Sequence, residues 1–103
     1  MAGPGCGTMM LLVVTRPDSS QILANLIRAC VRLDQKVSCF FTNDGVLALD
    51  NKAVLDAVQS TEEATVCMES WRTFMGEAAC PVQEGSQTHH SRLVAEATAI
   101  VSL

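Results

Sequence analysis

The sequence lacks several of the patterns by which enzymes are recognised. It contains no tyrosine, no G-x-S-x-G nucleophile elbow and no paired carboxylates at a spacing typical of acid–base catalysis. The polar segment after the first apolar run, Thr15–Ser20, has no glycine, so it lacks the loop that lets a backbone approach a pyrophosphate closely. These absences disfavour nucleotide binding and give no sign of a serine hydrolase.

Clusters of positive charge and long apolar runs are also missing. The chain has 11 acidic and 7 basic residues, a net charge of −4, and the basic residues are scattered. We therefore expect no direct contact with nucleic acid. The longest apolar run, Met9–Val14, is far too short to span a bilayer, so no membrane insertion is expected. Residues 1–7 have no positively charged region, which predicts a flexible N-terminal tail rather than a secretion signal.

The cysteine pattern indicates reduced thiols. The cysteines form an odd set without a C-x-x-C pair, whereas an extracellular disulfide framework is usually even in number. Structural zinc usually needs two closely spaced pairs of ligands, and the one close pair here, His89 and His90, is adjacent and too constrained to chelate well. We therefore expect a cytoplasmic protein without a metal site. The five cysteines are Cys6, Cys30, Cys39, Cys67 and Cys80.

The sequence does contain enough apolar material for one folded domain. Of its 103 residues, 49% are hydrophobic and 17% are charged, so a single hydrophobic core is expected. Strand-like apolar segments alternate with segments of helical periodicity, which predicts right-handed βαβ crossovers. We predict a single α/β domain over residues 8–103, with three layers: a mainly parallel sheet of four to five strands and helices on both faces.

The first strand is expected at Thr8–Val14, because a continuously apolar run is typical of a strand covered on both faces. Asp18 and Gln21 then form a capping-box-like pair, which predicts the start of a helix whose apolar stripe extends from Ile22 to Val31. Further along, we expect strands at Lys36–Phe41, Thr65–Met68 and Ala99–Leu103, helices at Asp50–Val58, after Met68 and from His89 onwards, and a mobile loop at Gly76–Thr88.

Polar residues follow the ends of the first three expected strands. Arg16 follows the first, Asn43 and Asp44 follow the second, and Cys67 ends the third. Parallel strands end at one edge of a sheet, where ligands gather in such folds, so we expect these residues to lie near one another. A guanidinium from Arg16 or Arg72 would then favour a thiolate at Cys67.

Cys67 is the candidate nucleophile. It directly precedes a helix, where unpaired backbone N–H groups and the helix dipole favour the thiolate. The alternative is that Cys67 is packed in the core, as we expect for Cys30 and Cys39. His89 and His90 could supply a base to the thiol, but an exposed helix start is the favoured interpretation for them.

Three segments resemble the DsrE/TusD-like sulfur-relay family. Phe40–Val46 is similar to the FF-x-x-DGV segment that follows the second strand in that family. Val66–Gly76 lies where the family has an apolar residue, the active cysteine and a helix leading to a glycine. Leu93–Val101 is similar to the family's final helix and edge strand.

The resemblance implies a small α/β subunit that accepts sulfane sulfur as a persulfide on one cysteine and passes it on. No metal or organic cofactor is implied. Of the family's functional residues, only the sulfur acceptor is carried over, and it falls on Cys67. The family supports tRNA thiolation or sulfur oxidation through oligomers of related subunits.

Three functional hypotheses follow. In the first, Cys67 relays sulfur from a donor protein to an acceptor protein, within a homo- or hetero-oligomer. In the second, the chain is a non-catalytic DsrE-like subunit that assembles with related subunits, and Cys67 is packed. In the third, Cys67 forms a redox or metal sensor with Cys80 or the histidines, which for a disulfide requires Cα atoms within about 7 Å.

Overall fold

The computed structural model describes residues 9–103, so the predicted flexible tail at residues 1–7 lies outside the described residues. Within this range strands and helices alternate. The strands are β1 (Met10–Val14), β2 (Val37–Phe41), β3 (Glu63–Cys67), β4 (Gln83–Gly85) and β5 (Ala99–Ser102). The helices are α1 (Ser20–Arg32), α2 (Lys52–Val58), α3 (Met68–Met75) and α4 (Gln87–Glu96), together with the 3-10 helices η1 (Pro17–Ser19) and η2 (Asn43–Asp50).

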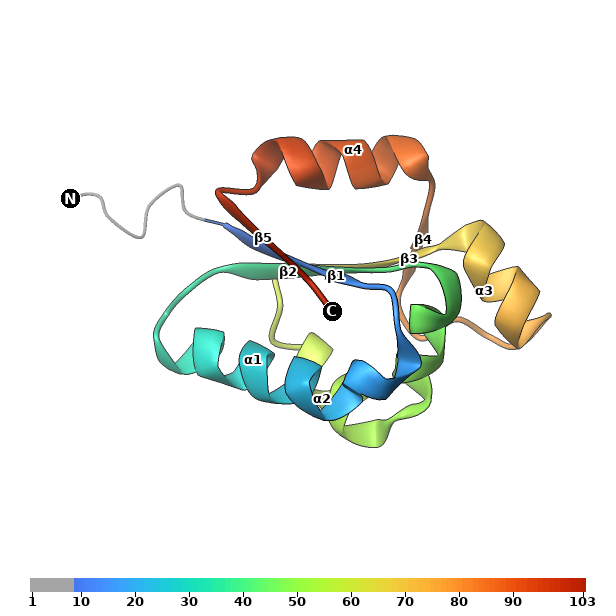
Figure 1. Cartoon of the computed structure of the whole chain (residues 1–103), viewed down its shortest axis with the longest axis horizontal. Helices are drawn as coiled ribbons and strands as arrows, with labels where there is room; N and C mark the ends of the chain where they lie inside the picture. Colours follow the sequence, from blue (N-terminus) through green and yellow to red (C-terminus); the bar gives the residue numbers. More distant parts are fainter. Residues whose placement is uncertain (1–8) are drawn as a thin grey trace.

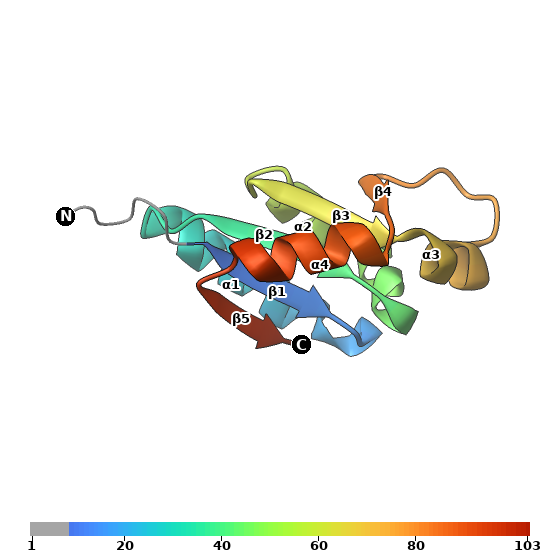
Figure 2. The same ribbon diagram turned by 90° about the horizontal axis from the view of Figure 1, so that it is seen from above.

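The strands form one all-parallel sheet in the order β4-β3-β2-β1-β5. Helices α1 and α2 cover one face, α4 covers the other, and α3 lies beyond one end of the sheet (Figure 1). Seen from above, α4 crosses over the sheet, and β5 forms the margin opposite β4 (Figure 2). The predicted three-layer α/β fold with a parallel sheet is confirmed.

Two clusters of apolar side chains lie on the two faces of the sheet. The larger cluster joins the sheet to α1 and α2, and β2 contributes to both clusters because it is central and buried along its whole length. The smaller cluster lies under α4 and consists of Leu11, Phe40, Cys67 and Leu93. Cys67 therefore lies on the α4 face of the sheet.

Two local predictions were wrong. Helix α1 begins at Ser20 after η1, and Asp18 pairs with the Arg16 side chain at 3.4 Å instead of capping the helix. The segment 76–88 was expected to be a loop, but it contains β4 and the first residues of α4. Strand β4 has only three residues, and Gln83 and Glu84 are exposed, so it carries no apolar signal in the sequence.

Helix α1 packs on the sheet through a narrower stripe than the sequence indicated. Leu23, Ile27 and Cys30 are buried, whereas Ile22 and Val31 at the margins are 57% and 45% exposed. Among residues 9–103 no helix combines the length and the apolar content needed to cross a membrane.

Gly45 allows η2 to pack against the end of β1. A Cβ atom on Gly45 would lie 2.2 Å from the Val14 carbonyl oxygen and 2.9 Å from Thr15 Cα, and neither backbone atom can rotate away. The same approach is fixed by the Thr42 N–H, which donates to the Val14 carbonyl at 3.0 Å. The close packing therefore places Thr42 and Asn43 at the carboxyl edge of the sheet.

We expect Gly45→Ala to lower the free energy of unfolding by about 2–3 kcal/mol, because the added methyl group forces η2 away from β1. Urea unfolding measures this change. The exposed control Gln59→Ala should stay within about 0.5 kcal/mol of the wild type. Equal stability of the two variants would contradict the close packing at Gly45.

Candidate functional site

Cys67 lies where β3 turns directly into α3. It is the last residue of the strand and has extended backbone angles (φ −65°, ψ 118°), and it is also the N-cap residue of the helix. No loop separates the two elements, so the thiol lies next to the unpaired N–H groups of the first turn of α3. The residue is 8% exposed.

The polar groups around the sulfur favour the thiolate. Burial raises the pKa of the Cys67 thiol, but hydrogen bonding from the Ser70 side chain and from the backbone N–H groups of Ser70 and Glu69 lowers it. The Thr42 side chain, at the end of β2, lowers it further. The lowering effects prevail, so the pKa of Cys67 lies below its ordinary value and the thiolate is more populated near neutral pH.

Asn43 orients the Ser70 hydroxyl. Asn43 has a left-handed backbone (φ +53°), which asparagine adopts more readily than most residues, and its N–H donates to Ser70 Oγ at 2.9 Å. Because this bond occupies a lone pair of the hydroxyl, the single O–H proton of Ser70 remains to donate to the sulfur. Thus the loop after β2 and the first turn of α3 act together on Cys67.

The other described cysteines have the opposite shift. Burial raises the pKa of Cys39 to about 12, with a further contribution from Cys30, and burial also raises the pKa of Cys30. Burial raises the pKa of Cys80, the nearby Glu84 carboxylate adds to this, and the Val82 N–H partly offsets it. Among the four cysteines that the structure describes, Cys67 is the one with a lowered pKa.

The predicted supporting residues do not all reach Cys67. Arg16 forms an exposed ion pair with Asp18, and Arg72 is an exposed residue of α3. Neither guanidinium contributes to the lowered pKa of Cys67. Asp44 is half-buried in the first turn of η2 and does not contribute either.

Two supporting residues were missed in the sequence. Ser70 lies three residues after Cys67, and the backbone N–H at that position of a helix faces the side chain of the N-cap residue. This spacing could have identified Ser70 from the sequence. Thr42 carried no comparable signal, because its approach to Cys67 depends on the pairing of β2 with β3.

The two histidines lie in the first turn of α4, so the expected helix start is present, but both side chains are half-buried and the expectation that they are exposed was wrong. The His90 ring stacks on Phe40 with ring centroids 4.4 Å apart, and its Nε2 is buried without a hydrogen-bond partner among residues 9–103. The His89 side chain is 17% exposed and contacts Glu63 and Thr65 of β3. In the described part of the chain, neither ring hydrogen-bonds Cys67, so the structure gives no support to a histidine base for this thiol.

Glu63 links α4 to β3. Its Oε2 lies 2.5 Å from His89 Nε2 and 2.6 Å from an Arg92 guanidinium nitrogen, so both side chains donate to one carboxylate oxygen. Arg92 also pairs with Glu96 at 3.0 Å. Burial raises the pKa of Glu63, but hydrogen bonds from His89 and Arg92 and their electrostatic interactions with the carboxylate outweigh burial and lower the pKa.

The sensor hypothesis gains no support from the arrangement of thiols. Cys67 belongs to the cluster under α4, whereas Cys80 packs against the larger cluster on the other face of the sheet. All four described cysteines are free. Within residues 9–103 there is no group of three or more histidine, cysteine, aspartate or glutamate side chains that could hold a metal ion.

The fold and the site together define an α/β protein with a parallel five-stranded sheet and a polarised cysteine at its carboxyl edge. Comparison of the sequence with protein-family models and with curated proteins gives no match. The resemblance to the DsrE/TusD-like family therefore stays a prediction from the quoted segments.

We expect Ser70→Ala to raise the pKa of Cys67, because the substitution removes a hydrogen-bond donor to the thiolate. The measurement is the pH dependence of iodoacetamide alkylation, followed at the Cys67 peptide by mass spectrometry so that other thiols do not contribute. The alkylation midpoint should move to higher pH, with a slower rate at pH 7. Ser91→Ala, at an exposed position of α4, is the matched control. An unchanged midpoint in Ser70→Ala would contradict the role of this hydroxyl.

The Glu63 cluster predicts a loss of stability in acid. Since the folded-state pKa of Glu63 lies below the ordinary value of a glutamate, ionised Glu63 stabilises the fold at pH values above that ordinary value. This contribution is lost as the pH falls through the folded-state pKa. Urea unfolding at pH 7, 5 and 3.5 measures it. Glu63→Gln should be less stable than the wild type at pH 7 and should lose less stability in acid. The matched control is Glu62→Gln, at the adjacent, exposed position, which should keep the wild-type dependence of stability on pH. If Glu63→Gln also kept the wild-type dependence, the stabilising role of ionised Glu63 would be refuted.

Proposed function

We propose that the protein is a sulfur-relay subunit that carries sulfane sulfur as a persulfide on Cys67. The observation that carries the proposal is the lowered pKa of this thiol at the β3–α3 junction, in contrast to the raised values of the other described cysteines. A thiolate is the nucleophilic form of cysteine, and a lowered pKa makes the thiolate more populated at a given pH and a better leaving group.

The relay consists of two exchanges that balance without a cofactor. The Cys67 thiolate attacks the outer sulfur of a donor persulfide, a new sulfur–sulfur bond forms, and the donor thiolate leaves and takes up a proton. The thiolate of an acceptor protein then attacks the outer sulfur of the Cys67 persulfide, and the Cys67 thiolate leaves. Sulfane sulfur moves between thiols, and no net oxidation occurs.

The local structure is consistent with this chemistry. The Ser70 hydroxyl and the N–H groups of the first turn of α3 stabilise the thiolate before attack and again when it leaves. Thr42 and Asn43 complete the surroundings from the end of β2. Two of the segments on which the family resemblance rests, Phe40–Val46 and Val66–Gly76, contain these residues.

The proposal extends to partners and compartment. Sulfur relay needs a donor protein, an acceptor thiol and reduced cysteines, which suits the cytoplasm, and the four described cysteines are free. Assembly with copies or related subunits belongs to the same proposal. The edge strand β5 supports it, because three of its four residues are exposed, including Ile100 at 49%.

A second candidate function is a non-catalytic subunit that assembles with related subunits. The observation that favours it is the burial of Cys67, which is 8% exposed and packs in one cluster with Leu11, Phe40 and Leu93. A relay thiol has to meet a donor sulfur, so in the first candidate the region over Cys67 must open when the donor binds. Accessibility of the thiol in the folded protein separates the two candidates.

The deciding experiment is incubation with a cysteine desulfurase and cysteine, followed by intact-protein and peptide mass spectrometry without reductant. We expect a gain of about 32 Da, the mass of one sulfur, on the Cys67 peptide, and its removal by a reducing agent. Cys67→Ser should abolish the gain, and Cys80→Ser is the control because it removes another free thiol. Equal labelling of the wild type and Cys67→Ser would reject Cys67 as the relay thiol and assign the sulfur to another cysteine. No labelling, together with slow alkylation of Cys67 in the folded protein, would reject the relay in favour of the second candidate.

A further inference from the structure

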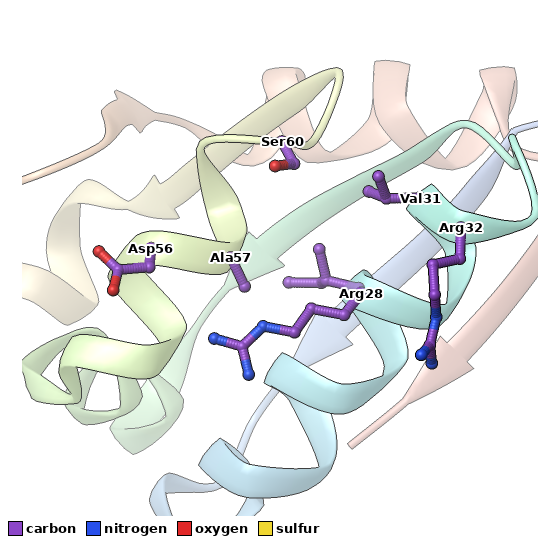
Figure 3. A pocket seen from close by; sticks show the side chains of 7 residues that line it. Arg28, Val31, Arg32, Asp56, Ala57 and Ser60 are labelled. Atoms are coloured by element: carbon purple, nitrogen blue, oxygen red, sulfur yellow. The ribbon is translucent and has the colours of Figure 1, made fainter.

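A pocket of about 380 Å³ lies between α1 and α2, away from Cys67. It opens on the face of the sheet opposite to α4, close to the ends of α1 and α2 that lead into β2 and β3, so it is near the amino ends of these strands. Cys67 lies at the carboxyl end of β3 on the other face. The pocket is lined by Ile27, Arg28, Val31, Arg32, Asp56, Ala57 and Ser60 (Figure 3).

The interior of this pocket is apolar. Ile27 and Ala57 are buried core residues that form part of its lining, and Val31 is 45% exposed in the same wall. Val31 is therefore an apolar side chain that remains accessible because the pocket beside it is open. The volume is in the range of pockets that bind small molecules, which are mostly apolar with a few polar groups that orient the ligand.

Arg28 supplies the polar group. Its side chain extends from α1 towards α2, whereas the side chains of Arg32 and Asp56 are directed away from it (Figure 3). Among residues 9–103 the Arg28 guanidinium has no ion pair and no hydrogen bond, unlike Arg16 and Arg92, which are both paired. An unpaired guanidinium beside an apolar pocket is complementary to a carboxylate, which it can bind through two parallel hydrogen bonds.

We propose that the pocket between α1 and α2 binds a small amphipathic carboxylate, with its apolar body against Ile27, Val31 and Ala57 and its carboxylate on Arg28. The net charge of −4 opposes non-specific binding of anions to this protein. Binding of an anion in the pocket would therefore depend on the local positive charge of Arg28. The site is separate from Cys67, and the proposal is independent of the sulfur relay.

The test uses the full chain and two probes. The first, 8-anilinonaphthalene-1-sulfonate, is a fluorescent amphipathic anion, and the second, octanoate, competes with it. We expect saturable fluorescence enhancement at one site, displacement by octanoate and no displacement by octylamine, which has an alkyl chain of similar length but a positive charge. Amide chemical shift changes on adding octanoate should concentrate in α1 and α2 around Arg28 and Ala57.

Matched variants locate the site. Arg28→Gln should weaken octanoate binding on the order of tenfold through the loss of a charge-assisted contact, whereas Arg16→Gln should not. Val31→Asp should abolish binding by placing a like charge in the pocket. Val94→Asp is its control, because Val94 is a comparably exposed valine (39%) on α4. Circular dichroism checks that each variant keeps the wild-type fold.

Three results would overturn the proposal. The first is the absence of saturable octanoate binding by the folded wild type. The second is equal displacement by octylamine together with wild-type affinity in Arg28→Gln. The third is a concentration-dependent dimer in sedimentation that Val31→Asp dissociates, because a second copy would then cover the pocket.

Discussion

The parallel pairing of β1, β2 and β3 is the constraint on which the candidate site depends. Because these strands run in one direction, the residues that follow them emerge at a single edge, although they are far apart in the sequence. Gly45 lets η2 approach the backbone at the end of β1, and this contact keeps Thr42 and Asn43 at that edge. Thr42 then lies close enough to Cys67 to influence its thiol.

The surroundings of Cys67 combine two opposing effects. Burial under α4 excludes water and by itself opposes ionisation of the thiol, as it does at Cys30 and Cys39. At Cys67 the strand passes directly into a helix, so the same burial brings backbone N–H groups and two hydroxyl groups to the sulfur. The difference between a packed cysteine and a polarised one therefore arises from its position at the end of the strand, because a cysteine inside a strand has backbone donors committed to the sheet.

The two faces of the sheet have different characters. On one face, α4 is held by the charged contacts of Glu63 with His89 and Arg92, which lie beside a small apolar cluster. On the other face, α1 and α2 cover the larger apolar cluster but leave a pocket between them. Chemistry at Cys67 and ligand binding beside Arg28 would thus use opposite faces and opposite ends of one small sheet, so neither requires the other.

The sequence by itself determined the alternation of strands and helices and the position of Cys67 at a strand–helix junction. These features depend on residues that are neighbours in the chain, such as the continuous apolar run of β1 and the periodic apolar residues of α1. It did not reveal β4, whose three residues carry no apolar pattern and which forms by pairing with β3. Only the tertiary structure decided that Asn43 orients Ser70, that Arg16 stays at the surface, and that His89 and His90 are drawn onto the sheet. The physical reason is that each of these outcomes depends either on contacts between residues distant in sequence or on the solvent exposure of a side chain. Local periodicity encodes neither of them.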